Sequence, residues 1–336
     1  MQSFFYDRAT HANQAVGLAQ QPDSRFIAGG TNLLDLMKND VMHASRLIDL
    51  NRAGLEAIAA TADGGLSLGA LARNSDTANH PLVRQRYPLL SQALLAGASA
   101  QVRNMATNGG NLMQRTRCYY FTDPAFTRCN KRVPGSGCAA MEGINRIHAI
   151  LGASAACIAT HPSDLCVALA ALDAVVVVRG PQGERRIPIQ EFHRLPGDQP
   201  QVDTVLAPGE LITAILLGPS PFAEHSHYLK VRDRASYAFA LVSVAVGLAL
   251  AGGVVYQAAV ALGGVAAKPW RIPGAEAPLL GQRPGTREFD RRAAAVAETL
   301  LAGARPFKGN QFKIPLAHRS IVRALQLAGR SPGGAA

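Results

Sequence analysis

The sequence predicts an α+β protein of 336 residues that contains more than one domain. Three patterns support this class: a strand–helix–strand unit near the N-terminus, a pair of long apolar strands after residue 237, and two helices in the last fifty residues. Hydrophobic residues make up 48% of the chain and charged residues only 17%, which is typical of a globular protein with a large core.

The N-terminal unit is expected to contain a helix at 10–20, strands at 25–28 and 46–50, and a helix at 33–38. The turn Gly29-Gly30-Thr31-Asn32 joins the first of these strands to the second helix. Such a turn offers free backbone amides to a phosphate, although it also serves as an ordinary connection. A second glycine turn at Thr107–Asn111, with no P-loop lysine nearby, suggests a cofactor pyrophosphate held from two sides.

The middle of the chain predicts strands at 66–70, 174–178, 185–189 and 209–215, and helices at 81–96 and 165–172. A boundary is expected at Gly218-Pro219-Ser220-Pro221. Beyond it we expect strands at 228–232, 238–250 and 254–262, and helices at 287–302 and 314–327. The uncharged segment 238–255 has the length of a membrane span, but Gly252-Gly253 interrupts it, so we interpret it as two buried strands joined by a turn.

All five cysteines lie between Met105 and Cys166, at positions 118, 129, 138, 157 and 166. Disulfides suit small secreted chains and would leave one cysteine over. An iron–sulfur cluster, a zinc site and plain thiols remain open, because the spacing matches none of the common motifs. Basic neighbours such as Arg117 and Lys131, and the backbone amides of Pro134-Gly135-Ser136-Gly137, favour thiolates as metal ligands.

Cys166 differs from the other four cysteines because it follows Ser163-Asp164-Leu165, which resembles the capped first turn of an apolar helix. We therefore expect Cys166 to be a buried free thiol that packs as a small hydrophobic side chain. Cys118, Cys129, Cys138 and Cys157 remain as the expected metal ligands.

The net charge of +11 is scattered along the chain rather than gathered in one run, and aromatic residues make up only 6%. This composition argues against a nucleic-acid-binding protein and fits anionic cofactors or acidic partner surfaces. The first twenty residues show no signal-peptide pattern.

Several motifs together resemble the FAD-binding subunits of the molybdenum hydroxylases, the family of xanthine dehydrogenase and aldehyde oxidoreductase. The resemblance covers nearly the whole chain. It rests on IAGGTNLLDLMK at 27–38, ATNGGN at 106–111, SDL at 163–165, GELI at 209–212, Lys230 and LGGVAAKPWR at 262–271. The insertion with its cysteines resembles the periplasmic aldehyde oxidoreductase subunits that carry FAD and a 4Fe–4S cluster.

The resemblance implies a vanillyl-alcohol-oxidase or PCMH-type FAD-binding domain at 1–218, with α/β subdomains at 1–54 and 55–218. The cluster loop would be inserted at about 112–160. A smaller α+β domain with a three-stranded sheet and helices would follow at 219–330, and a flexible tail at 331–336.

The same resemblance implies the roles of individual residues. It makes Cys118, Cys129, Cys138 and Cys157 the ligands of a 4Fe–4S cluster. Asp164 would hydrogen-bond the FAD, Ile212 would pack at the adenine side, and Lys230 would lie near the flavin ring. The residues expected around the FAD pyrophosphate are Phe26, Ile27, Ala28, Gly29, Gly30, Thr31, Asn32, Leu33 and Leu34 in the first turn, and Ala106, Thr107, Gly109, Gly110 and Asn111 in the second.

The function implied is electron transfer within an aldehyde oxidoreductase, in a heterotrimer with a 2Fe–2S subunit and a molybdopterin subunit. Electrons would pass from the 2Fe–2S subunit to FAD and then to an external acceptor. The alternatives within the family are the flavin subunit of a hydroxybenzoyl-CoA reductase or of an NAD-linked xanthine dehydrogenase. A zinc-stabilised binding module and a stand-alone flavin oxidase are alternatives of other classes. The resemblance favours a periplasmic location reached by co-export with a partner, and a cytoplasmic location is the alternative.

Overall fold

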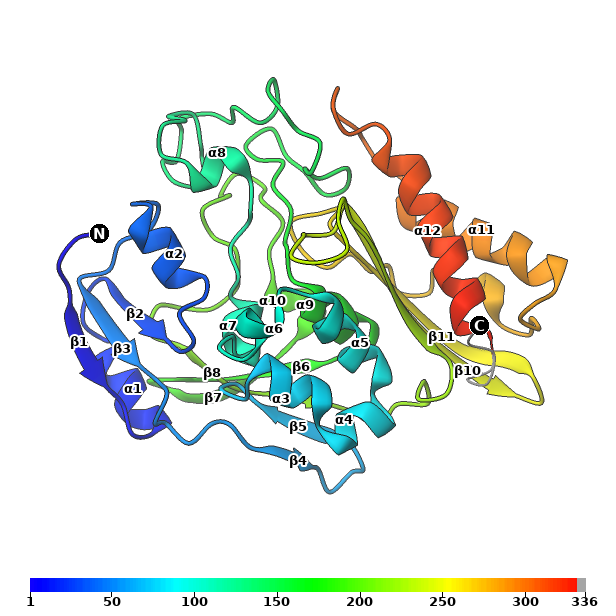
Figure 1. The fold of residues 1–336 in the computed structure, drawn as a ribbon, viewed down its shortest axis with the longest axis horizontal. Coiled ribbons are helices and arrows are strands. Elements are labelled where there is room, and N and C mark those ends of the chain that lie inside the picture. Colours follow the sequence, from blue (N-terminus) through cyan, green and yellow to red (C-terminus); the bar gives the residue numbers. More distant parts are fainter. Residues whose placement is uncertain (331–336) are drawn as a thin grey trace.

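The structure, a computed structural model, describes residues 1–330, so the flexible tail expected at 331–336 lies outside the described residues. Three sheets and the helices packed on them make up the fold (Figure 1). The predicted α+β class is confirmed, and the smaller C-terminal part contains the predicted three-stranded sheet, which is antiparallel.

The N-terminal unit is a three-stranded parallel sheet of order β1-β3-β2. Its elements are β1 (Phe5–Arg8), α1 (Ala12–Leu18), β2 (Ser24–Ile27), α2 (Leu33–Lys38) and β3 (Arg46–Asp49). The βαβ prediction for β2, α2 and β3 is confirmed. The strand β1 was not predicted, because its four residues carry no alternating apolar pattern.

The second sheet has the order β4-β5-β8-β6-β7, and its neighbouring strands are antiparallel. Its strands are β4 (Ile58–Ala60), β5 (Leu66–Gly69), β6 (Val175–Gly180), β7 (Gly183–Pro188) and β8 (Leu211–Leu217). The accompanying helices are α3 (Asn74–Asn79), α4 (Pro81–Arg86), α5 (Pro88–Ala96), α6 (Ala100–Arg103), α7 (Asn108–Leu112), α8 (Tyr119–Thr122), α9 (Asp164–Ala171) and α10 (Ile189–Phe192).

Two predictions in this part are wrong in detail. The single helix expected at 81–96 is split at Tyr87, because Pro88 begins a new helix and disfavours a helical conformation at the residue before it. The second glycine turn is the short helix α7, which Thr107 caps by accepting a hydrogen bond from the amide of Gly110. The sequence Asn108-Gly109-Gly110-Asn111 predicts a turn rather than a helix because glycine is a poor helix former.

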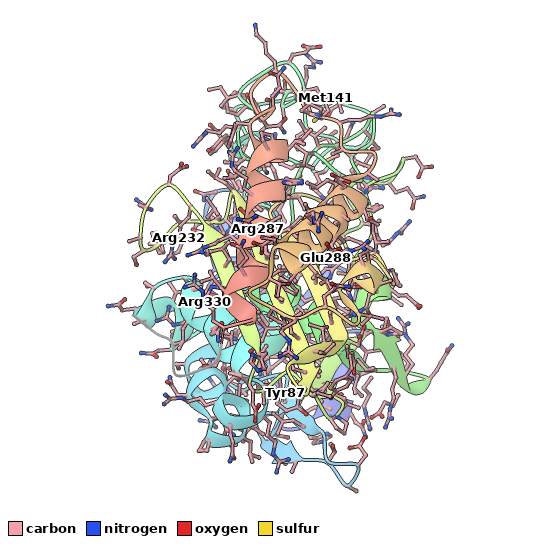
Figure 2. The ribbon with its side chains drawn as sticks, turned by 90° about the vertical axis from the view of Figure 1, so that its right-hand side faces the viewer. Tyr87, Met141, Arg232, Arg287, Glu288 and Arg330 are labelled. Carbon is pink, nitrogen blue, oxygen red and sulfur yellow. The ribbon has the colours of Figure 1, made fainter. Side chains whose placement is uncertain are left out.

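The C-terminal sheet has the order β11-β10-β9 and carries its helices on one face, as Figure 1 shows; this face is turned toward the viewer in Figure 2. The elements are β9 (Ser226–Val231), β10 (Val242–Ala251), β11 (Val254–Gly263), the 3₁₀-helix η1 (Ala277–Leu279), α11 (Arg287–Leu301) and α12 (Lys313–Ala328). Gly252 and Gly253 form the predicted turn between β10 and β11, and both have positive φ angles, 57° and 77°.

The strand β10 is apolar throughout because both of its faces are covered. Val244 and Val246 face the core under α11 and α12, whereas Ala245 and Ala249 pack into the core that contains α5 and α9. A strand buried on both sides needs no alternation of polar and apolar residues. No helix among residues 1–330 combines the length and apolarity needed to cross a bilayer.

Candidate functional site

The two glycine-bearing segments lie directly against each other. A Cβ atom added to Gly29 would lie 1.9 Å from the carbonyl oxygen of Met105, which is a backbone atom. Gly29 therefore has to be glycine for the first turn to approach the residues that precede α7. The structure brings together the two segments that the sequence predicts on either side of one ligand.

The first turn leaves hydrogen-bond donors free. Among the described residues, the backbone amides of 29–33 form no hydrogen bond. The side-chain oxygen of Asn32 accepts a hydrogen bond from the amide of Arg115 at 3.0 Å, but its Nδ2 atom is buried and has no partner. A buried donor without a partner is costly, so these groups fit an anionic ligand such as a pyrophosphate.

The second segment is held in place by buried amides. Asn108 is fully buried, and its Nδ2 atom donates to the hydroxyl of Thr77 at 2.9 Å and to the carbonyl of Gly69 at 3.2 Å. Asn111 is tied to Ser163, whose hydroxyl donates to the Asn111 Oδ1 atom at 2.6 Å. Gly110 is exposed at the start of α7. The scaffold around α7 is therefore rigid, and Gly110 stays open whereas Gly109 is buried against Ala70.

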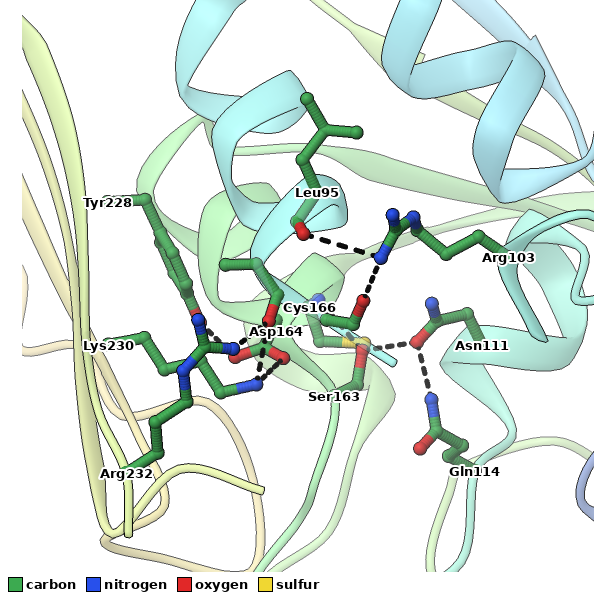
Figure 3. A network of polar contacts seen from close by, with 12 residues as sticks. Leu95, Arg103, Asn111, Gln114, Ser163, Asp164, Cys166, Tyr228, Lys230 and Arg232 are labelled. Atoms are coloured by element: carbon green, nitrogen blue, oxygen red, sulfur yellow. Dashed lines mark hydrogen bonds and ion pairs between the residues drawn. The ribbon is translucent and has the colours of Figure 1, made fainter. Parts of the chain in front are cut away.

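Asp164 and Lys230 form a buried ion pair. The Nζ atom of Lys230 lies 2.7 Å from the Asp164 Oδ2 atom, and the two side chains are only 4% and 8% exposed. The hydroxyl of Tyr228 donates to the other oxygen of Asp164 at 2.6 Å, as Figure 3 shows. Lys230 and Arg232 also donate to the carbonyl of Ala96. The two residues predicted separately are thus partners in one network.

The remaining predicted residues fall into two groups. Phe26, Ala28 and Leu34 are half-buried on the N-terminal unit, as expected for a surface beside a ligand. Ile212 lies in β8 and is buried in the hydrophobic core, with 6% of its surface exposed.

Cys118, Cys129, Cys138 and Cys157 line one small pocket, together with side chains such as Tyr120 and Phe121. Short backbone pairings hold this loop, because Cys129 pairs with Cys138, and Cys157 pairs with Ser154. Burial raises the pKa of Cys118 to about 12 and that of Cys157 to about 11, so both are neutral thiols unless a cation binds them. Cys166 is buried outside this group, in α9.

Basic side chains within the cysteine loop stabilise it through hydrogen bonds and ion pairs. The guanidinium group of Arg132 donates to the carbonyls of Tyr120, Phe121 and Asp123. The Nζ atom of Lys131, whose side chain is 6% exposed, contacts Asp203.

Asp203 also accepts a hydrogen bond from Arg115 at 2.8 Å. Burial would raise the pKa of Asp203, but Lys131 and Arg115 outweigh it and hold the pKa below its usual value. The basic residues of the loop therefore serve partly as structural ties to the following segment.

One residue beside the pocket was missed by the sequence analysis. The Nε2 atom of His148 lies 3.0 Å from the Sγ atom of Cys118. Burial lowers the pKa of His148 to about 4, so its ring is neutral and can donate one N–H to the sulfur. Only its position between Cys138 and Cys157 marked it in the sequence.

Comparison with known proteins identifies the family. Residues 2–220 match the FAD-binding domain in molybdopterin dehydrogenase, and residues 227–328 match the CO dehydrogenase flavoprotein C-terminal domain. The chain is a member of the family of FAD-binding subunits of molybdenum hydroxylases. This FAD-binding subunit is 52% identical to the aldehyde oxidoreductase FAD-binding subunit PaoB of Escherichia coli, over 97% of this chain and 98% of that protein.

More distant relatives agree with this assignment. The subunit is 28% identical to the glyceraldehyde dehydrogenase medium chain of Sulfolobus acidocaldarius, over 83% of this chain and 82% of that one. Its fold matches the solved structure of carbon monoxide dehydrogenase from Hydrogenophaga pseudoflava with a TM-score of 0.74, at 25% identity and 97% coverage of both chains. The predicted family and its oxidoreductase class are confirmed.

Proposed function

We propose that this chain is the electron-transfer subunit of a molybdenum-dependent aldehyde oxidoreductase, and that it carries both FAD and a 4Fe–4S cluster. The aldehyde class rests on the 52% identity with the Escherichia coli aldehyde oxidoreductase subunit. The observation that carries the cluster is the convergence of Cys118, Cys129, Cys138 and Cys157 on one pocket.

The choice of a cluster over zinc rests on the resemblance to the aldehyde oxidoreductase subunits that carry FAD and a 4Fe–4S cluster. Four thiolates in one pocket suit either a cubane or a single zinc ion, and the metal and sulfide analysis below separates the two.

The residues around the glycine turns fit FAD. The free amides of 29–33 and the unpartnered Nδ2 atom of Asn32 are suited to the pyrophosphate. When bound, FAD and the cluster supply the hydride and one-electron chemistry. The chain itself binds and orients them, and Asp164 keeps the Lys230 ammonium group in a fixed position for the flavin site.

The proposal includes a heterotrimer with a 2Fe–2S subunit and a molybdopterin subunit, located in the periplasm after co-export with a partner. Low charge content and exposed apolar side chains, such as Ile144 at 70% and Val133 at 57% exposure, are compatible with partner contacts around the loop. The location rests on the family resemblance alone.

The first experiment measures iron, labile sulfide and released flavin in the chain purified without oxygen. We expect FAD and iron at about four per chain, with a flavin band over a broad iron–sulfur absorption. Cys157→Ser should lose iron and sulfide, whereas Cys166→Ser should keep both. Zinc in place of iron would contradict the cluster, and an absence of flavin would contradict the FAD assignment.

A further inference from the structure

Three ligand-type side chains outside the cysteine pocket meet in the interior. They are His161 before α9, Cys166 within α9, and His193 after α10. Each offers a ligand atom, and the three atoms all lie within 4.8 Å of one another. Among residues 1–330 no other group of three histidine, cysteine or acidic side chains is as close.

The two histidines present unpartnered nitrogen atoms. The Nδ1 atom of His193 and the Nε2 atom of His161 are both buried, and neither has a hydrogen-bond partner. The ring centroids of the two side chains are 4.3 Å apart. His193 is only 3% exposed, so water from the surface does not reach it. Buried polar atoms are nearly always satisfied, so two unpartnered nitrogen atoms beside each other mark a place that can accept a ligand.

The other nitrogen of His193 is already engaged. Its Nε2 atom lies 2.9 Å from the carbonyl oxygen of Leu112, so it carries the proton and donates to that oxygen. This tautomer leaves a lone pair on the buried Nδ1 atom, which has no hydrogen-bond partner. A metal-binding histidine usually donates its second N–H to a carbonyl or carboxylate, which orients the ring. The contact between His193 and Leu112 has this form.

The protonation states also suit a metal. Burial lowers the pKa of His193 to about 4 and that of His161 well below its usual value, so both rings are neutral with free lone pairs. Burial raises the pKa of Cys166 to about 12, so the thiol loses its proton only when a cation takes its place.

We propose that Cys166, His161 and His193 form a buried binding site for a thiophilic metal ion, Cu⁺ or Zn²⁺. One thiolate and two imidazoles suit copper and zinc and are poor ligands for magnesium or calcium. With Zn–S and Zn–N bonds of about 2.3 and 2.0 Å, neighbouring donors lie about 3.5 Å apart, which small side-chain rotations reach from the present spacing.

The charge of the metal–thiolate unit favours Cu⁺. A monovalent ion and one thiolate make a neutral unit, whereas a divalent ion leaves one positive charge in the interior. Lys131 acts on His161, whereas Asp203 and Lys268 act on His193 in opposite directions, so the preference for Cu⁺ rests on the neutrality of the Cu⁺–thiolate unit. The site is independent of the proposed cluster, because it shares no ligand with the four cysteines of the pocket.

The test loads the full chain with metal during expression, since the site is closed in the folded protein. One culture is supplemented with copper and another with zinc, and metal, iron and sulfide are counted after purification with a chelator and without oxygen. We expect about one copper or zinc per chain in addition to the iron. Cys166→Ser and His193→Gln should lose this metal and keep iron and sulfide. The glutamine can still donate to the carbonyl of Leu112.

His225→Gln is the matched control, because His225 is a partly buried histidine whose Nδ1 atom contacts the carbonyl of Ala328. It should keep the metal. X-ray absorption of the wild-type chain requires no variant and should show one sulfur and two nitrogen donors. A wild-type chain without copper or zinc would overturn the proposal, since a buried water would then satisfy the two nitrogens. Unchanged metal in both variants, or a shell of sulfur alone, would also overturn it. A wild-type chain that contains copper or zinc but no iron would contradict the proposed cluster and support this site.

Discussion

Replacing Gly29 with alanine tests the contact between the two glycine-bearing segments. The added Cβ atom would lie 1.9 Å from the Met105 carbonyl oxygen, and an ordinary contact begins at 3.4 Å, so the two backbones must separate by about 1.5 Å. Neither partner is a flexible side chain that could move aside. Overpacking of this kind costs about 1–3 kcal/mol.

The Gly29→Ala protein should therefore lose about 1–3 kcal/mol of unfolding free energy in urea denaturation. Its affinity for FAD should fall about 5-fold to 150-fold if the same displacement opens the cofactor site. The released flavin can be followed by its fluorescence on dilution.

Gly17→Ala is the matched control. A Cβ atom at Gly17 meets no atom within 4 Å, and the residue lies within α1, where alanine is favoured over glycine by about 0.5–1 kcal/mol. This variant should bind FAD normally and be slightly more stable. If Gly29→Ala matched the wild type in both stability and FAD affinity, the close approach of the two segments would be wrong.

Three further perturbations have defined outcomes. Lys230→Met leaves the buried carboxylate of Asp164 without its cation and should lower the unfolding free energy by about 3–5 kcal/mol in urea. Burial lowers the pKa of Lys313 from 10.5 to about 7. Between these pH values the unfolded chain binds more protons than the folded chain, so the free energy of unfolding should rise with pH. Lys313→Met should abolish that rise in denaturation experiments. His148→Phe removes the donor at 3.0 Å from the Cys118 sulfur and should make the potential of the proposed cluster more negative in a redox titration monitored by EPR.

Each of these outcomes has a clear opposite. An unchanged midpoint in urea would show that Lys230 does not neutralise Asp164. A pH profile shared by wild type and Lys313→Met would show that the lysine stays charged after folding. An unaltered potential with full iron content would separate His148 from the cluster.

Long, regular patterns made most of the fold predictable. The hairpin of β10 and β11 was recognisable because ten-residue apolar strands flank two adjacent glycines. The unit of β2, α2 and β3 could be predicted because a glycine turn separates its first strand from its helix. Shorter elements were missed, since β1 has four residues and α7 contains two glycines. Local propensity carries little information over such lengths.

The site was predictable only where a motif lies within one stretch of sequence. The four ligand-type cysteines and both glycine segments were found in this way, although the ligand roles themselves stay predictions. The pairing of Asp164 with Lys230 spans 66 positions, and the contact of His148 with Cys118 spans 30. Such contacts depend on the packing of separate elements, which no periodicity in the sequence reveals.

The contacts that close the cysteine loop come from the end of the chain. Asn310 donates to the carbonyls of His148 and Ala149, and Lys313 donates to those of His148 and Gly264. During synthesis all four pocket cysteines leave the ribosome before these residues exist. For the proposed cluster, this order would place iron insertion before α12 packs against the loop.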